Sequence, residues 1–163
     1  MPNTYWVVPG RLLAGEYPGG SDSLDSRNRL ARLEDCGVDY IVDLTVEGEL
    51  PAYRHLLSPR TVYLRFEILD TWIPDSVEQT RQLLADIHTA LAAGHCVYVH
   101  CRAGIGRTGL IIGCFLAETE TAGKAALKDL NRLWKQSERS SSWPKLPQTP
   151  EQADYIRRWT RSG

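Results

Sequence analysis

The sequence has little that would anchor it in a membrane or draw it to a polyanion. Its longest apolar run, residues 109–117, is far shorter than the roughly 20 residues that a membrane-spanning helix needs. Its 19 Lys and Arg residues nearly balance its 20 Asp and Glu residues, which leaves a formal net charge of −1. A chain without excess positive charge does not bind nucleic acid or lipid headgroups by bulk attraction. We therefore expect no nucleic-acid or membrane partner, and any bound anion must be held by a local site.

The cysteines lack the spacing of a metal site. Cys36, Cys96, Cys101 and Cys114 form no C-x-x-C pair and have no nearby histidine cluster of the zinc-binding kind. The first residues also lack the basic segment and following apolar segment of a secretory signal. We therefore expect a cytoplasmic protein with reduced thiols and without a metal or other cofactor.

Strand-like and helix-like segments alternate along the chain. Runs of β-branched and apolar residues predict strands at residues 40–44, 61–66 and 96–100, with a hairpin of residues 5–8 and 11–14 before them. Apolar residues at helical spacing predict helices at residues 24–36, 75–93, 108–118, 122–135 and 150–161. The Ser- and Pro-rich residues 137–150 predict a surface loop between the last two helices. The pattern predicts one α/β domain over residues 1–163, with a mainly parallel sheet flanked by helices.

The turn between the predicted strand at residues 96–100 and the next helix carries the chemistry. It reads HCRAGIGRTG over residues 100–109. Ligands of α/β sheets bind at the carboxyl ends of strands, where helix N-termini offer unpaired N–H groups to anions. Three glycines in six residues allow the backbone to aim its amides inward. The turn therefore predicts a cradle for a phosphate-sized anion.

Two nucleotide-binding interpretations fail on spacing. The letters GIGRTG spell G-x-G-x-x-G, but a dinucleotide fold needs a following strand with an acidic residue about 20 positions on. Two helical patterns follow here instead, with Asp129 in the middle of the second. The nucleotide P-loop needs G-x-x-x-x-G-K-S/T, whereas Cys101 stands at its first glycine and Arg107 at its lysine.

A nucleophilic cysteine explains the remaining residues of the turn. The thiolate is the reactive form of cysteine, and a helix N-terminus and cationic side chains stabilise it. Cys101 has the predicted helix downstream and Arg102 and Arg107 nearby. The planar guanidinium of Arg107 can bind two phosphate oxygens and stabilise the charge of a transferring phosphoryl group. Thr108 brings a hydroxyl that can hydrogen-bond the sulfur.

The order His100-Cys101, five residues, Arg107-Thr108 is the H-C-x5-R-S/T signature. It closely resembles the active-site loop of the cysteine-dependent protein phosphatases, and the order of strands and helices fits that superfamily around most of the chain. The resemblance implies a compact, dual-specificity-like phosphatase in which His100 orients the loop and supports the thiolate. The residues implied to bind the substrate phosphate are Arg102, Ala103, Gly104, Ile105, Gly106 and Arg107.

Family members place a general acid, an aspartate, on a loop that follows a strand upstream of the cysteine. Asp70 with Pro74 matches the Asp-x-x-x-Pro pattern of the dual-specificity enzymes. Asp75 is the alternative, but Asp75 and Glu78 are spaced as a capping box, which explains Asp75 without catalysis. Glu67 occupies a position where relatives often have proline, which leaves the path of this loop open.

A glutamine near the C-terminus positions the hydrolytic water in some family members. Residues 149–152, TPEQ, resemble that segment and make Gln152 the candidate. Thr149 and Gln152 also have the spacing of a capping box, and both roles can hold if the helix N-terminus lies near the site. Asp43 and Glu49 follow a predicted strand and could line the cleft, although solvated loop carboxylates explain them more simply.

These residues predict a phosphoprotein phosphatase that acts as a monomer on a phosphorylated protein or peptide. Cys101 attacks phosphorus, Asp70 protonates the leaving oxygen, and Arg107 and the loop amides bind the phosphate. Phosphotyrosine is the expected substrate, with phosphoserine and phosphothreonine as further candidates, because pocket depth cannot be derived from the sequence.

Two alternatives remain open. A phosphoinositide or RNA-phosphate phosphatase could use the same loop, but phosphoinositide relatives often carry lysines where Ala103 and Ile105 stand. A non-catalytic phosphate-binding pseudophosphatase is disfavoured because Cys101, Arg107 and Asp70 are all present.

Overall fold

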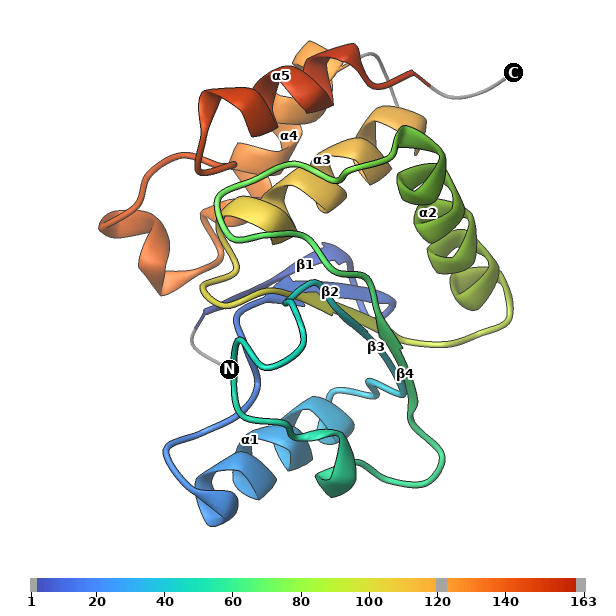
Figure 1. The fold of residues 1–163 in the computed structure, drawn as a ribbon, viewed down its shortest axis with the longest axis vertical. Coiled ribbons are helices and arrows are strands. Elements are labelled where there is room, and N and C mark those ends of the chain that lie inside the picture. The colour runs from blue at the N-terminus through green and yellow to red at the C-terminus, as the bar shows by residue number, and fades with distance from the viewer. Residues whose placement is uncertain (1–2, 120–122, 161–163) are drawn as a thin grey trace.

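The computed structural model describes residues 3–119 and 123–160, and these contain the predicted alternation of strands and helices (Figure 1). The strands are β1 (Thr4–Val8), β2 (Leu12–Gly15), β3 (Tyr40–Asp43), β4 (Val62–Arg65) and β5 (Val97–His100). The α-helices are α1 (Ser23–Asp35), α2 (Val77–Ala92), α3 (Gly106–Thr119), α4 (Gly123–Trp134) and α5 (Pro150–Arg158). The 3-10 helices η1 (Arg54–Leu56) and η2 (Glu138–Ser141) lie in connections. The predicted α/β class is confirmed, while residues 122 and 161, two predicted helix ends, lie outside the described residues.

The five strands form one sheet in the order β1-β2-β5-β3-β4. Only the β1–β2 pair is antiparallel among the described strands, as expected for a hairpin, and the other pairs are parallel. The last residues of the parallel strands are in register: Gly15 and Asp43 both pair with His100, and Asp43 pairs with Arg65. The sheet therefore delivers four chain segments side by side to one edge, where ligands of such sheets bind.

Helices cover both faces of this sheet. Figure 1 shows α1 and η1 on one side and the other α-helices on the opposite side. Every residue of the central strand β5 is buried, which explains why its sequence is almost continuously apolar. Val97 and Val99 join the larger core with α2 to α5, and Tyr98 joins the smaller core beside α1.

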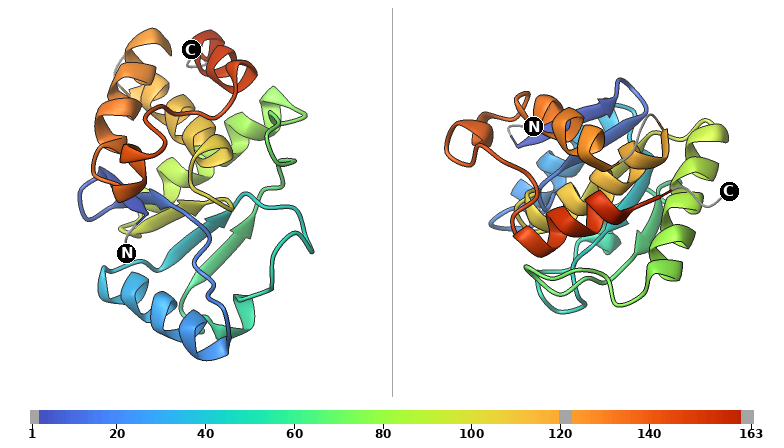
Figure 2. Two further views of the ribbon diagram at one scale, coloured as in Figure 1. Left: turned by 90° about the vertical axis from the view of Figure 1, so that its left-hand side faces the viewer. Right: turned by 90° about the horizontal axis from the view of Figure 1, so that it is seen from above.

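Helix α3 is buried on all sides from Gly106 to Ala117. It lies between the sheet and the pair formed by α4 and α5, as both views in Figure 2 show. This enclosure fixes the start of α3, which projects from the end of β5 after only five residues. In the described part of the chain, no helix combines the length and the apolar character needed to cross a membrane.

The start of α2 corrects one prediction. Ser76, and not Asp75, is the N-cap, and its hydroxyl accepts a hydrogen bond from the Gln79 amide at 3.3 Å. The predicted capping box of Asp75 and Glu78 is therefore wrong, because the N-cap lies one residue later, at Ser76. The helix begins at Val77, and its apolar stripe buries Leu83, Leu84 and Ile87 as expected. The predicted capping box of α5 is confirmed, with both Thr149 and Gln152 making their reciprocal hydrogen bonds.

Candidate active site

The phosphate loop, residues 101–105, joins the end of β5 to the start of α3. Cys101 is 2% exposed and follows His100 directly, at the carboxyl edge of the sheet. Helix α3 begins at Gly106, two residues earlier than predicted, so its unpaired first amides lie nearer to the cysteine than the sequence suggested. Gly104 has φ +74°, and a Cβ on it would lie 2.6 Å from the carbonyl carbon of Gly15. Glycine is therefore required where the loop packs against the end of β2.

Arg107 connects this loop to the segments after β3 and β4. Its side chain is 1% exposed, and its Nη1 and Nη2 donate to the two carboxylate oxygens of Glu49 at 2.7 and 2.8 Å. Nη1 also donates to the Ile68 carbonyl at 3.0 Å, and Nη2 lies 3.0 Å from Asp70 Oδ1. The buried Nε has no hydrogen-bond partner among the described residues. A planar guanidinium held in this way is aligned to receive a further anion.

The charges around Arg107 reinforce one another. Burial disfavours a charged guanidinium, but the hydrogen bond with Glu49 and the nearby Cys101 more than compensate and raise the pKa of Arg107. The same hydrogen bond from Arg107 lowers the pKa of Glu49. Both side chains are therefore charged at neutral pH.

Asp70 lies at the cradle, and Asp75 does not. The side chain of Asp70 is 53% exposed and reaches Arg107, although it belongs to the loop between β4 and α2. The next residue, Thr71, has φ 65°, an uncommon conformation for a residue with a Cβ, and its amide donates to Asp70 Oδ1 at 3.0 Å. Asp75 instead lines a separate groove between β4 and α2. The geometry thus favours Asp70 over its alternative.

His100 is held beneath the loop in one protonation state. Its Nδ1 lies 3.1 Å from the Cys101 carbonyl oxygen, which can only accept, so Nδ1 is the donor. Burial lowers the pKa of His100, so the ring is neutral and Nε2 accepts from the Tyr53 hydroxyl at 2.5 Å. Asp43 Oδ1 lies 3.8 Å from the same nitrogen. These contacts support the predicted role of His100 in orienting the loop.

Comparison with known proteins agrees with this geometry. Residues 1–153 match the family model PTP-SAK, described as "Swiss Army Knife protein, DSP-PTPase phosphatase domain". The chain belongs to this family. A curated relative from Invertebrate iridescent virus 3, named "Putative tyrosine phosphatase 067L", is 32% identical over 123 residues, 73% of this chain and 48% of the viral protein. Protein 197R of Invertebrate iridescent virus 6 is 28% identical over 123 residues, so the chain spans about half the length of these relatives.

Solved structures show the same fold. Tk-PTP in its active form superimposes with a TM-score of 0.77 at 24% identity, covering 95% of this chain and 94% of that one. Kinase associated phosphatase (KAP), with its catalytic cysteine substituted by serine, gives a TM-score of 0.78 at 21% identity, with 96% and 93% covered. The predicted dual-specificity-like phosphatase fold is thus confirmed.

Gln152 lies between the loop of Asp70 and the first residue of α3. Its side chain is fully buried, and its Nε2 donates to the Trp72 carbonyl at 2.9 Å, in the same loop as Asp70. A Cβ on Gly106, the first residue of α3, would lie 3.1 Å from Gln152 Oε1. The N-terminus of α5 therefore lies near the phosphate loop, which allows the capping and site roles to coexist. Its role in placing a water stays a prediction.

The remaining predicted residues divide between the interior and the rim. The Thr108 hydroxyl is buried and donates to the Gly15 carbonyl at 3.4 Å, so in this structure its polar contact is with β2 and the predicted bond to sulfur is not seen. Arg102 has a side chain that is 51% exposed and lies 3.3 Å from Glu49. The described residues contain no group of three or more His, Cys, Asp or Glu side chains suited to a metal ion.

The simpler interpretation of Asp43 and Glu49 as solvated loop carboxylates is wrong. Asp43 is 1% exposed and accepts hydrogen bonds from Thr45 and Tyr63, while the Glu49 side chain is 13% exposed and bridges two arginines. Burial tends to raise the pKa of Asp43, but these hydrogen bonds contribute to a net lowering. For Asp43 the available signal was its place at the carboxyl end of β3, where it pairs with His100.

Proposed function

We propose that this phosphatase domain hydrolyses phosphotyrosine in proteins through a phosphocysteine intermediate, without a metal ion. The observation that carries the proposal is the position of Arg107. It lies in the first turn of α3, directly after the loop of Cys101, holds Asp70 at 3.0 Å, and keeps a buried Nε donor without a partner among the described residues. This position supports Cys101 as the nucleophile, Arg107 as the phosphate ligand and Asp70 as the proton donor of one site.

In the first step the phosphate enters the cradle, and its oxygens bind Nε and Nη2 of Arg107 and the loop amides. The Cys101 thiolate attacks phosphorus, an S–P bond forms, and the bond from phosphorus to the tyrosine oxygen breaks. Asp70, protonated at this point, gives its proton to that oxygen. General acids of this kind typically contribute about 10²–10⁴ to the rate.

In the second step water replaces the departed tyrosine. Asp70, now a carboxylate, takes a proton from the water, whose oxygen attacks phosphorus while the S–P bond breaks. Inorganic phosphate leaves and the thiolate is restored. Gln152 is the residue that we expect to orient this water, since its amide lies beside the first residue of α3.

The charges of the loop favour a protein substrate over a phosphoinositide. PTPMT1, which has been solved in complex with PI(5)P, shares the fold with a TM-score of 0.73 at 18% identity, so the fold does not separate the two substrates. The inner loop side chains here, Ala103 and Ile105, are uncharged, and the one additional basic residue, Arg102, is paired with Glu49. A headgroup with several phosphates would therefore meet little free positive charge. RNA phosphates are disfavoured by the net charge of −1.

The test compares hydrolysis of phosphotyrosine and phosphoserine peptides and of phosphoinositide by the wild-type protein and Cys101→Ser, with EDTA present throughout. We expect phosphotyrosine hydrolysis that survives EDTA and disappears in the serine variant. Turnover by Cys101→Ser would overturn the mechanism, loss of activity in EDTA would overturn metal independence, and preferential hydrolysis of phosphoinositide would overturn the substrate class.

A further inference from the structure

The segment between α4 and α5 sends one side chain to the phosphate loop. Arg139, in η2, donates from Nη1 to the Ala103 carbonyl at 2.7 Å. Its Nη2 lies 2.9 Å from Glu16 Oε2, and its side chain is 29% exposed. The predicted surface loop therefore contains a fixed arginine that contacts the candidate active site.

Three consecutive carbonyl groups of the phosphate loop are held by donors from outside residues 101–105. The pairs are His100 Nδ1 to Cys101 O at 3.1 Å, the Tyr17 amide to Arg102 O at 3.1 Å, and Arg139 Nη1 to Ala103 O at 2.7 Å. In a planar trans peptide the carbonyl and the next N–H point in opposite directions. Carbonyls drawn outward therefore turn the amides of residues 102–104 toward the centre of the loop.

We propose that Arg139 is a positioning residue of the phosphate cradle. By holding the Ala103 carbonyl outward, it directs the N–H of Gly104 toward the bound phosphate. Gly104 needs such an external contact because a glycine at φ +74° can change conformation at little steric cost. The proposal rests on the proposed function for the identity of the anion, but it does not depend on turnover.

Glu16 fixes Arg139 in this position. Its Oε2 accepts from Arg139 and also from Asn3 Nδ2 at 3.0 Å, and its side chain is 13% exposed. The Glu16 backbone nitrogen would lie 2.9 Å from a Cβ on Gly104, so the same residue also packs against the turn of the phosphate loop. Glu16, Arg139 and Ala103 thus form a continuous chain of contacts from the end of β2 to the cradle.

The test measures phosphate binding apart from catalysis. Inorganic phosphate is titrated calorimetrically into Cys101→Ser and into the same protein carrying Arg139→Ala or Arg139→Lys. We expect Arg139→Ala to weaken phosphate binding about tenfold, the size of one charge-assisted hydrogen bond. Arg139→Lys should lose less, because its ammonium keeps one donor for the Ala103 carbonyl. In the catalytically active background, kcat/KM for a phosphotyrosine peptide should fall by a similar factor.

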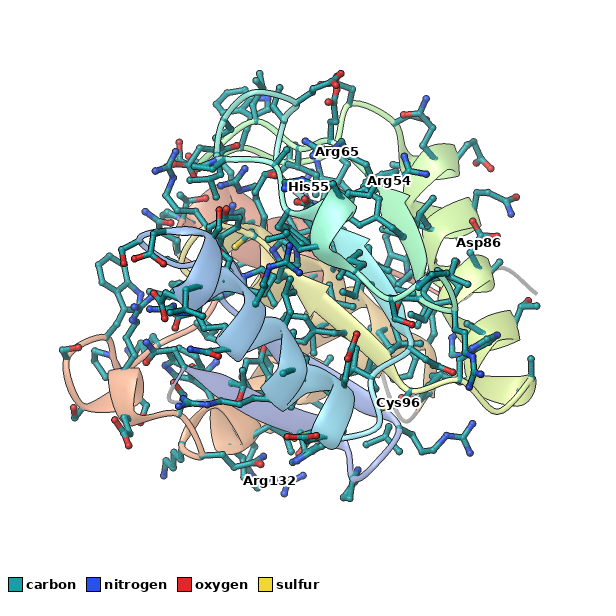
Figure 3. All side chains as sticks on the ribbon, turned by 90° about the horizontal axis from the view of Figure 1, so that it is seen from below. Arg54, His55, Arg65, Asp86, Cys96 and Arg132 are labelled. Atoms are coloured by element: carbon teal, nitrogen blue, oxygen red, sulfur yellow. The ribbon has the colours of Figure 1, made fainter. Side chains whose placement is uncertain are left out.

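Arg132→Ala is the matched control. Arg132, labelled in Figure 3, is a 68% exposed arginine on α4, and among the described residues its ion pair is with Asp129 of the same helix. We expect wild-type phosphate affinity from it. Millimolar methylguanidinium should restore phosphate binding to Arg139→Ala and leave Arg132→Ala unchanged, which a general loss of stability would not do.

Equal phosphate affinity of Arg139→Ala and Arg132→Ala, each compared as folded protein by thermal melting, would overturn the positioning role. A loss that neither lysine nor methylguanidinium reduces would overturn it as well. Turnover by Cys101→Ser would instead remove the proposed function while leaving these binding comparisons meaningful, so the two failures are distinguishable.

Discussion

The two loops that meet at the candidate active site are built in opposite ways. In the phosphate loop and the first turn of α3, Cys101, Arg107 and Thr108 are at most 2% exposed, and donors from several elements hold the backbone. In the loop that carries Asp70, Leu69 is 61% and Trp72 is 55% exposed. Segments with few buried contacts open at low free-energy cost. The comparison indicates a rigid part around Cys101, the proposed phosphate site, and a more loosely packed part around Asp70, the proposed proton donor.

The loop of Asp70 is nevertheless attached at two points. Ile68 is 1% exposed, and its carbonyl accepts from Arg107, the proposed phosphate ligand. Trp72 is held by Gln152 at the N-terminus of α5. Asp70 lies between these two contacts, so it can be released from Arg107 without being carried far from the cradle. This arrangement suits the role proposed for Asp70, which would give way to a phosphate oxygen and then protonate the leaving group.

The largest effect is expected from Asp70→Asn. The amide cannot donate a proton as an acid does, so kcat should fall about 10²–10⁴-fold, and less for substrates with good leaving groups. Because Asp70 is half exposed, the free energy of unfolding should change by no more than about 0.5 kcal/mol. Steady-state kinetics and urea denaturation check both. If Asp75→Asn, the matched control, shows the leaving-group dependence instead, the assignment of the acid is wrong.

Arg107→Lys tests the rigid side of the comparison. A lysine cannot reproduce the fork that binds Glu49 and a phosphate together, so kcat/KM should fall about 10²–10³-fold. The free energy of unfolding should fall by about 1–3 kcal/mol, because a buried carboxylate loses part of its hydrogen bonding. If Arg107→Lys has the same free energy of unfolding as the wild type, the conclusion that the contacts of Arg107 hold this part of the site rigid is wrong.

Gln152→Ala removes one attachment of the Asp70 loop. It leaves the Trp72 carbonyl without its donor, and kcat should fall about tenfold, within the range of one hydrogen bond. The phosphocysteine form should accumulate if Gln152 places the water, and rapid quenching followed by mass spectrometry detects it. A lower kcat without that accumulation would restrict Gln152 to holding the loop.

The smallest effect is expected in the pH dependence of stability, through His100 beneath the phosphate loop. Burial lowers the pKa of His100 below its ordinary value near 6.5. Below pH 6.5, therefore, His100 becomes protonated in the unfolded chain while it stays neutral in the folded protein. Stability is therefore complete above about pH 6.5 and decreases as the pH falls toward the lowered pKa. His100→Asn should reduce this loss by about 1 kcal/mol between pH 7.5 and 5. Tyr53→Phe keeps the histidine buried and should therefore lose stability at low pH as the wild type does. If the free energy of unfolding falls with pH equally in the wild type and in His100→Asn, the interpretation is wrong.

Local spacing was enough to predict most of the fold and the centre of the site. The strand, glycine-rich turn and helix around Cys101 are contiguous, so their residue pattern records the cradle directly. The N-cap of α2 was predicted one residue early because two adjacent residues, Asp75 and Ser76, can both cap a helix, and local spacing does not decide between them. Glu49 was judged too simply, since nothing in its local sequence shows that Arg107 lies opposite.

Arg139 and Cys96 show that the sequence does not reveal which distant residues meet at the site. Arg139 and Cys96 are equally unremarkable as sequence features, yet η2 places Arg139 against the phosphate loop. Cys96 precedes β5 and lies at the opposite end of the sheet from Arg65, as Figure 3 shows. The direction of each parallel strand decides which of its ends faces the site.

The sequence by itself determined the α/β class and predicted Cys101, Arg107 and Asp70 as the centre of the candidate site, because a covalent chain fixes spacing within a turn and the pattern of a strand or helix. Only the tertiary structure decided which carboxylate neutralises Arg107, which end of α5 lies near the cradle, and which donors hold the loop carbonyls. Apart from His100 with its neighbour Cys101, those contacts join residues far apart along the chain, for example Arg107 with Glu49 over 58 positions and Arg139 with Ala103 over 36. Packing around a shared core, and not local propensity, brings such residues together.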